Sequence, residues 1–536
     1  MRVLRKAGIV SLCTLGSRVL GLVRDILSAM VFGSSPVMGA FVIAFRIPNL
    51  FRRLFGEGAF AAAFIPTFST YLHRDDRREA WRLFSTVATA LAALLAGIVV
   101  ALELLVLGAD ALMDVDPNTH MLLRLTAVML PFMLFICMTA LASATANVLE
   151  RFALPALAPV VMNVFWIGAL LGCLWWSVEP KRAVYYVAWA VVLSSVVQFV
   201  MQLPQLVRAG MRLRPRLDLS HPGLRQITRL MGPVVVGAAT FQINLVVDSL
   251  LARQMVDRSA PAILYYSDRL IQLPMALFGL ALATVIFVEM SRAAGENRFD
   301  DFRAILFRGI RGVLVVTVPA ALGIAVLREP IITLFFRSGE FGPEAVERAG
   351  RVLLCYAPAV WIYSVLHLQV RAFYSLQDTR TPVRVSMVMV GLNLVLNVVF
   401  VLASPWVLGH RSEAGLALAT STSALVQMIV LHELLAKQVG EAGLMQVLWT
   451  FVKAQVAGVV MVAAVFGVHH LLMVHLLPGD WHDRVRLLVA VSVDVSVGVL
   501  VYSLVALLLR IDELKHVMSR AADKLLRRRN GKATER

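Results

Sequence analysis

The stretch SRVLGLVRDI, residues 17–26, places two arginines and an aspartate inside an otherwise apolar segment. The run AGIVSLCTLG precedes it and LSAMVFG follows it, so residues 7–33 have the length and composition of a membrane-spanning helix. A charged side chain near the bilayer centre costs about 2.5–3.5 kcal/mol. We therefore expect Arg18, Arg24 and Asp25 to face a hydrated cavity walled by protein rather than lipid.

The rest of the chain also has the composition of an integral membrane protein. Of its 536 residues, 59% are hydrophobic and 16% are charged, and the mean hydropathy is +0.77, which soluble globular proteins do not reach. Ten runs of at least 18 residues carry almost no charge: 83–102, 125–149, 152–178, 183–207, 230–247, 270–288, 352–370, 385–410, 414–432 and 454–482. Four further spans are short or interrupted: 7–33, 36–64, 312–327 and 487–509. The sequence FGSSP at 32–36 is typical of a turn and separates the first two of these. The sequence thus predicts an all-α integral membrane fold with fourteen transmembrane helices.

The positive charge is distributed unevenly along the chain. The net charge is +17, and the connection 208–229 carries six arginines while the tail 510–536 carries nine Lys or Arg. The connections 33–39 and 108–120 carry none. Because cytoplasmic loops are enriched in Lys and Arg, this asymmetry predicts that both termini are cytoplasmic. The basic tail is expected to face anionic membrane lipids and not nucleic acid.

The first and second halves of the chain resemble each other. Residues 22–65 align without a gap on 245–288, with 11 of 44 positions identical, including the charged matches Asp25/Asp248 and Arg46/Arg269. Helices one to six and seven to twelve are therefore predicted to be parallel repeats with a substrate site at their interface. The predicted parts are an N-lobe over 1–220, a C-lobe over 221–440, two additional helices over 441–510, and a basic cytoplasmic tail over 511–536.

Charged residues gather in the predicted second and eighth helices as well as in the first. Local pairs are expected between Arg53 and Glu57, between Arg18 and Asp25, and between Arg269 and Asp268. The first helix pair still holds five arginines against two acids. Guanidinium groups bind phosphate through a planar fork of donors, so this excess predicts a phosphorylated substrate attached to lipid. The alternative, that these residues are interfacial or serve only in ion pairs, stays open.

Two motifs link the chain to a known family. SRVLGLVRDI at 17–26 and FRIPNLFRRLFGEGAFAAAFIP at 45–66 resemble the MurJ (MviN) lipid II flippases of the MOP exporter superfamily, and the resemblance covers all fourteen predicted spans. It implies two six-helix lobes around a V-shaped cationic cavity, and a groove for an isoprenoid tail at helices thirteen and fourteen. It also implies a transporter of the bacterial inner membrane rather than an enzyme. The implied activity moves undecaprenyl-diphosphate-linked disaccharide pentapeptide to the outer leaflet for peptidoglycan synthesis.

The resemblance also assigns residues to the substrate site. The arginines implied to bind substrate are Arg18, Arg24, Arg52 and Arg269, and the supporting residues in the same motifs are Ser17, Asp25, Arg46, Asn49, Arg53, Glu57 and Asp268. One departure from the family concerns the outer end of the second helix, where some members carry an acidic residue and this chain has Gly39. A gating carboxylate is therefore not expected there.

A sodium site is a further implication of the resemblance. Its ligands would be Asp248, Asn393, Asn397 and Thr420, all of which supply hard oxygen donors. Since Asn397 stands where a second aspartate could be, the alternative is that the two asparagines form hydrogen bonds between helices. No cofactor besides sodium is implied.

Other functional classes remain alternatives. The same architecture serves O-antigen-type lipid-linked oligosaccharide flippases and cation-coupled drug antiporters. An enzyme acting on lipid-linked sugars would instead need an acid or base on a large external loop.

The last loop has histidines near it that are expected to be interfacial rather than to bind a metal: His469, His470, His475 and His482. The expected partners are lipid II, membrane lipids and other cell-wall synthesis proteins.

Overall fold

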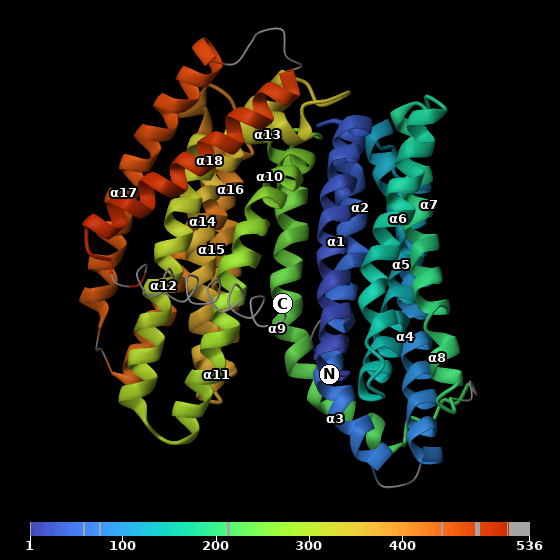
Figure 1. Cartoon of the computed structure of the whole chain (residues 1–536). Helices are drawn as coiled ribbons and strands as arrows, with labels where there is room; N and C mark the ends of the chain where they lie inside the picture. The colour runs from blue at the N-terminus through green and yellow to red at the C-terminus, as the bar shows by residue number, and fades with distance from the viewer. Residues whose placement is uncertain are drawn as a thin grey trace, which may run out of the picture. The chain divides into compact units, whose positions relative to one another are not determined.

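The computed structural model describes residues 2–56, 59–73, 77–211, 215–440, 443–476, 483–511 and 513, and every regular element in these ranges is a helix (Figure 1). Among the described residues, eleven helical segments are long and apolar enough to cross a membrane. The predicted all-α membrane class is therefore confirmed. Three more helices coincide with remaining predicted spans, namely α1 (Arg2–Phe32), α2 (Pro36–Gly56) and α9 (Pro222–Met255). The count of fourteen stays a prediction.

The chain forms two compact units. The first contains residues 1–262 and 338–345, and the second contains 263–337 and 346–536. The first unit thus includes α9, which the predicted lobe boundary at residue 220 assigns to the second repeat. The lobes describe an internal repeat rather than compactness, and they stay a prediction.

Nine helices of the described residues belong to the first unit. Besides α1, α2 and α9 these are α3 (Ala59–His73), α4 (Arg77–Leu112), α5 (Pro117–Val148), α6 (Ala153–Trp175), α7 (Pro180–Val200) and α8 (Leu203–Val207). Within this unit α2 packs against α5 and α9, and α1 packs against α6. Buried aromatic rings join α2 to α6, where Phe41 and Phe45 form T-shaped contacts with Trp166 at 5.2 and 5.4 Å between centroids.

The predicted turn between the first two helices is confirmed, and it docks a distant segment of the chain. The helix α1 ends at Phe32, and α2 begins at Pro36. Gly33 has φ +58° and lies so close to the Glu340 carbonyl that a Cβ at residue 33 would stand 2.2 Å from its oxygen. Gly339, with φ +56°, lies equally close to the Met30 carbonyl. The backbone N–H of Glu340 donates to that same Met30 oxygen at 3.2 Å. Two glycines therefore bring residues 338–345 into the first unit.

The second unit is built from the remaining helices. These are α10 (Ala260–Pro274), the π-helix η1 (Met275–Leu280), α11 (Ala281–Gly295), α12 (Phe299–Val326), α13 (Arg328–Phe336), α14 (Pro343–Ser375), α15 (Arg380–Leu408), α16 (Ala414–Val439), α17 (Leu444–Leu471), the π-helix η2 (Leu472–Leu476) and α18 (Asp483–Leu508). The segment α10, η1 and α11 is continuous. The first residues of α10 and α14 belong to the first unit.

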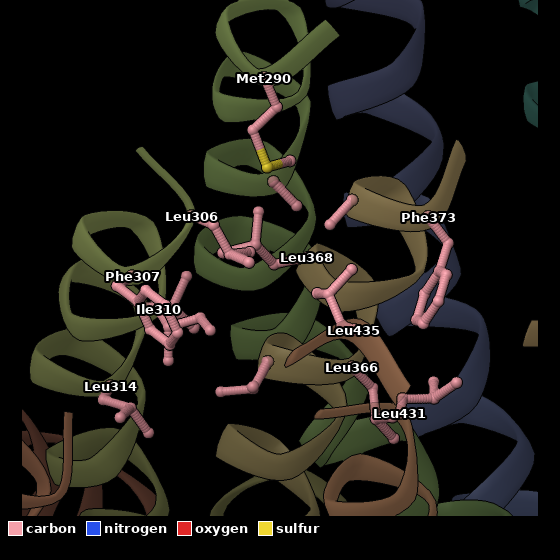
Figure 2. Packing of buried hydrophobic residues seen from close by; sticks show 14 of the residues in the cluster. Met290, Leu306, Phe307, Ile310, Leu314, Leu366, Leu368, Phe373, Leu431 and Leu435 are labelled. Atoms are coloured by element: carbon pink, nitrogen blue, oxygen red, sulfur yellow. The ribbon is translucent and has the colours of Figure 1, made fainter. Parts of the chain in front are cut away.

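Apolar side chains from four helices form the core of the second unit. Figure 2 shows Met290 of α11, Leu306 and Ile310 of α12, and Leu368 of α14 pointing toward one another, with Leu435 of α16 close by. All of them are buried. A second cluster joins α12 to α17 and α18. The two helices beyond the predicted repeats are thus packed on the second unit through apolar contacts.

Candidate functional site

The Arg24 side chain is buried in the first unit and held on several sides. Its Nε and Nη2 atoms donate to Asp25 Oδ1 at 3.0 and 2.8 Å, and its Nη1 donates to Asn163 Oδ1 at 3.1 Å. The ring of Trp166 lies 4.6 Å from Arg24 Cζ. Only 5% of Arg24 is exposed. The guanidinium is thus fixed in position by α6 and by its own neighbour in α1.

Arg18 has a different environment from Arg24. Its side chain is exposed and makes no hydrogen bond or ion pair with any residue that the structure describes. The predicted pair between Arg18 and Asp25 is therefore wrong, because Asp25 pairs with the adjacent Arg24 instead. A carboxylate one residue away reaches the guanidinium directly, whereas one seven residues away on a helix lies about two turns from it.

Asn163 is a site residue that sequence reasoning missed. It is buried on α6, and its Nδ2 donates to the Ser17 carbonyl oxygen at 2.9 Å while its Oδ1 accepts from Arg24. One amide therefore contacts α1 on both sides of Gly21. The sequence does contain a signal for this residue, because Asn163 is the one amide side chain in the apolar run 152–178.

The arginines of α2 reach two different neighbours. Arg52 Nε donates to Asn49 Oδ1 at 2.7 Å, within the same helix. Arg46 Nη1 donates to the Leu245 carbonyl oxygen at 2.6 Å and to Ser249 Oγ, both in α9. Among the supporting residues predicted in α2, Asn49 and Arg46 thus orient side chains and join helices.

Arg53 extends the contact between α2 and α9. Its Nη1 donates to Gln242 Oε1 of α9 at 3.3 Å. Residue numbers rise along α2 as they fall along α9, so the two helices run antiparallel where Arg46 and Arg53 connect them. The predicted partner of Arg53, Glu57, lies outside the described residues.

Close packing explains the departure at Gly39. A Cβ at this position of α2 would stand 2.1 Å from the carbonyl oxygen of Arg258, in the turn after α9. The Arg258 guanidinium in turn pairs with Asp116 at 3.0 Å. In this structure no side chain fits at residue 39. The glycine is therefore required by the packing, and an acidic side chain could not replace it.

Arg269 and Asp268 belong to the second unit and lie on α10. The guanidinium of Arg269 donates to Gln272 Oε1 at 3.2 Å and to the Tyr265 hydroxyl at 3.3 Å, and it covers the Tyr265 ring at 4.8 Å. Gln272 also donates to Asp268. One glutamine therefore bridges the two predicted partners. The first unit holds Arg18, Arg24 and Arg52, and a common site with Arg269 stays a prediction.

The predicted sodium ligands also fall in both units. Asp248 in α9 belongs to the first and accepts from Asn244 Nδ2 at 3.2 Å. In the second unit Asn397 Nδ2 donates to Asn393 Oδ1 at 3.0 Å, and Asn393 Nδ2 donates to Ser423 Oγ at 3.1 Å. The Thr420 hydroxyl donates to the Leu416 carbonyl. Asn393 thus forms a hydrogen bond from α15 to α16, as the alternative predicts, whereas Asn397 bonds to Asn393 within α15. The sodium site stays a prediction.

Acidic side chains near the ends of helices are stabilised as carboxylates. Asp116 caps α5, and its hydrogen bond from the Thr119 hydroxyl, together with the backbone N–H groups of Asn118 and Thr119, lowers the pKa of Asp116. The Ser220 hydroxyl lowers the pKa of Asp218 in the basic connection before α9.

No group of three or more His, Cys, Asp or Glu suited to a metal occurs among the described residues. His482 lies outside them.

Known proteins resemble this chain over most of its length. Residues 28–507 match the family model described as lipid II flippase MurJ. A probable lipid II flippase MurJ of Vibrio cholerae is 35% identical over 480 residues, covering 86% of this chain and 88% of the relative. The lipid II flippase MurJ of Burkholderia cenocepacia is 33% identical over 442 residues, covering 80% and 83%. These relatives are named as transporters and not as enzymes.

Solved structures share the fold. A structure described as lipid II flippase MurJ in an inward closed conformation superposes with a TM-score of 0.76 at 22% identity, covering 94% of this chain and 98% of that one. An inward-facing multidrug resistance MATE transporter of the MOP superfamily gives 0.63 at 15% identity, covering 79% and 94%. The predicted MOP-type fold is thereby confirmed. By its family match and its sequence identity to these relatives, the chain belongs to the MurJ family of lipid II flippases.

Proposed function

We propose that this protein moves lipid II from the inner to the outer leaflet of the bacterial cytoplasmic membrane by alternating access, with both termini in the cytoplasm. Lipid II consists of an isoprenoid diphosphate that carries a disaccharide pentapeptide. The match to the MurJ family over residues 28–507 is the observation that carries the proposal. The arginines of α1 and α2 supply the chemistry for the diphosphate.

The charge balance of α1 and α2 supports binding of an anionic group. Five arginines of the apolar parts of these helices stand against one described acid, Asp25, and that acid is paired with Arg24. Burying this excess in a bilayer is costly unless an anion or water compensates it. A diphosphate supplies such an anion, and it accepts the parallel N–H bonds that a guanidinium offers.

The different environments of the arginines suggest that they have different roles in binding the substrate. Arg24 is held by Asp25, Asn163 and Trp166, so its guanidinium is part of a fixed wall in which Asp25 balances its charge. Arg18 is exposed and lies six residues before it on the same helix. We assign Arg18 and Arg52 to direct contact with the diphosphate, Arg24 to the fixed wall, and Arg269 to contact from the second repeat. Asp248, Asn393, Asn397 and Thr420 remain the proposed ligands if sodium drives the cycle.

Complementation and transport assays test this proposal. Arg18→Ala, Arg24→Ala and Arg52→Ala should each abolish growth of a cell depleted of its MurJ protein. Membrane levels should stay normal in the Arg18 and Arg52 variants, whereas Arg24→Ala removes the cation paired with the buried Asp25 carboxylate and should also lower them. Lysine at residue 18 or 52 should restore growth only in part, because an ammonium lacks the planar fork of donors. Arg225→Ala is the matched control, since Arg225 is an exposed arginine near the start of α9 and outside the cluster. It should grow normally.

Transport measured with purified protein in liposomes tests the lipid II activity and the role of the arginines separately. The wild-type protein should move lipid II across the bilayer, and a lipid-linked O-antigen precursor should move much more slowly. Equal transport of both lipids would favour the general exporter alternative. Full transport by the Arg18→Ala/Arg52→Ala double variant would contradict the arginine assignment while leaving the lipid II activity intact.

A further inference from the structure

An ionisable pair stands in the apolar interface between α17 and α18. The contacts around it are those of small and aliphatic residues, and Gly498 packs against Val465 and Met461. One helical turn from these contacts, His469 Nδ1 of α17 lies 2.6 Å from Asp494 Oδ2 of α18. The substrate-site residues described above do not include either side chain. The proposed binding of lipid II therefore assigns no role to this pair.

Asp494 is enclosed much more completely than its partner. Its exposed fraction is 0%, whereas 25% of the His469 side chain is exposed. The second carboxyl oxygen, Oδ1, is buried and has no hydrogen-bond partner among the described residues. Asp25, which is also buried, receives two N–H groups from the guanidinium of Arg24. Among the described residues Asp494 has no such cation, because the partner they provide is an imidazole that carries charge only when it is protonated.

The described residues of the neighbouring elements place no other charged group in contact with Asp494. The helices α17 and α18 pack against each other, and also against α12, α13 and η2. Among the described residues none of the ionisable side chains in the nearby parts of these elements bonds to the pair; they are Arg328, Glu329, His470, His475, Asp483, Arg484 and Arg486. Arg484 and Arg486, for example, donate to the carbonyl oxygens of Arg337 and Met473.

Three arrangements of protons are compatible with the short contact. In two of them Asp494 is a carboxylate, and it accepts the Nδ1 proton of either a neutral imidazole or a charged imidazolium. In the third, a neutral Asp494 carboxyl donates its Oδ2 proton to the Nδ1 atom of a neutral imidazole. The first two arrangements leave a charged carboxylate with one oxygen unbonded in an apolar interface, which is costly. The third leaves only a carbonyl-type oxygen without a donor.

We propose that His469 and Asp494 form a proton-binding site within the membrane, in which one proton is held on Asp494 Oδ2 and donated to His469 Nδ1. The ligand of the site is a proton taken from water, and binding it keeps the pair neutral. The hydrogen bond then fixes the alignment of α17 and α18, because a single polar pair in an apolar interface favours the one alignment in which both groups meet. This inference concerns the two helices beyond the repeats and does not depend on lipid II transport.

Infrared spectroscopy of the full-length protein in lipid bilayers tests the site directly. At neutral pH the wild-type protein should show the carbonyl stretch of a protonated carboxyl group, and the band should shift on exchange into D2O. Asp494→Asn should remove this band. Asp218→Asn is the control, because hydrogen bonds from Ser220 and Arg82 keep Asp218 ionised outside the membrane, and it should leave the band unchanged.

A second variant and a second measurement keep the proposal open to refutation. If Asp494→Asn does not fold, Asp494→Glu should retain the protonated band at a shifted frequency. Nitrogen NMR of His469 should show a neutral ring whose Nδ1 accepts a hydrogen bond. An unchanged infrared spectrum in both Asp494 variants, or an imidazolium signal from His469 at neutral pH, would overturn the neutral pair.

Discussion

Single side chains decide how the arginines of this protein are used. Arg24 and Arg18 lie in the same motif, yet one is buried against Trp166 and Asn163 and the other is exposed. The difference comes from α6, whose Asn163 and Trp166 stand three residues apart on one face and meet the α1 surface at Arg24. Asn163 is thus a positioning residue for the proposed phosphate-binding wall.

Replacing Asn163 should weaken the first unit and its arginine wall together. Asn163→Ala removes the acceptor for Arg24 Nη1 and the donor to the Ser17 carbonyl, which should lower the free energy of unfolding by about 1 kcal/mol. Thermal unfolding in detergent measures the loss, and a double-mutant cycle with Arg24→Ala should show that the two losses are not additive. Val164→Ala, at an exposed position of the same helix, is the control. Additive losses would argue against coupling between Asn163 and Arg24.

Segments far apart in the sequence meet where glycine removes the side chain. The turn after α1 and the loop between α13 and α14 approach through Gly33 and Gly339, each in the left-handed region with a carbonyl of the other segment where a Cβ would stand. Any L-residue there meets both a steric clash and an unfavourable φ. The contact between residues 30–33 and 339–340 therefore requires glycine at both positions.

Alanine at either glycine should release the loop. Gly33→Ala and Gly339→Ala should each increase hydrogen exchange at the amide of Glu340, which donates to Met30 O, and the double variant should add little because one substitution already separates the segments. Mass spectrometry of residues 338–345 measures the exchange. Gly97→Ala in α4, where nothing lies within 4 Å of the added carbon, is the matched control and should leave exchange unchanged. Protection that persists in both variants would show that the loop is held by other contacts.

At the scale of the whole molecule, the internal repeat suggests how transport proceeds. Two parallel halves that rock against each other would open a common chamber to one side of the membrane at a time. Ser69 in α3 and Arg292 in α11 occupy matching positions at the offset of 223 that relates 22–65 to 245–288. On the proposed topology both lie toward the cytoplasm, so they should approach each other when the chamber faces outward.

A reversible cross-link between these positions tests the rocking motion. In a background without the native cysteines, Ser69→Cys together with Arg292→Cys should form a disulfide when the Cα atoms come within about 7 Å. The link should block lipid II transport, and reduction should restore it. Each single cysteine variant is the control. Unimpaired transport in fully cross-linked protein would rule out the rocking model and leave the arginine assignment untouched.

The membrane class, the all-helical fold and the family could all be predicted from the amino-acid sequence. Uncharged runs long enough to span a bilayer, the turn at 32–36 and the motifs at 17–26 and 45–66 are local signals, because insertion into lipid depends on composition along a short stretch of chain. The number of spans and the relation between the two repeats remain predictions from the same signals.

The contacts between distant groups could not be predicted and are seen only in the folded chain. Asn163 lies 139 residues from Arg24, and Arg46 contacts Leu245 and Ser249 across 199 and 203 residues. His469 meets Asp494 in the same way, although neither residue belongs to a motif that predicts a site. These partners are chosen by how helices pack, and helical periodicity specifies only which face a residue occupies, not which helix covers that face.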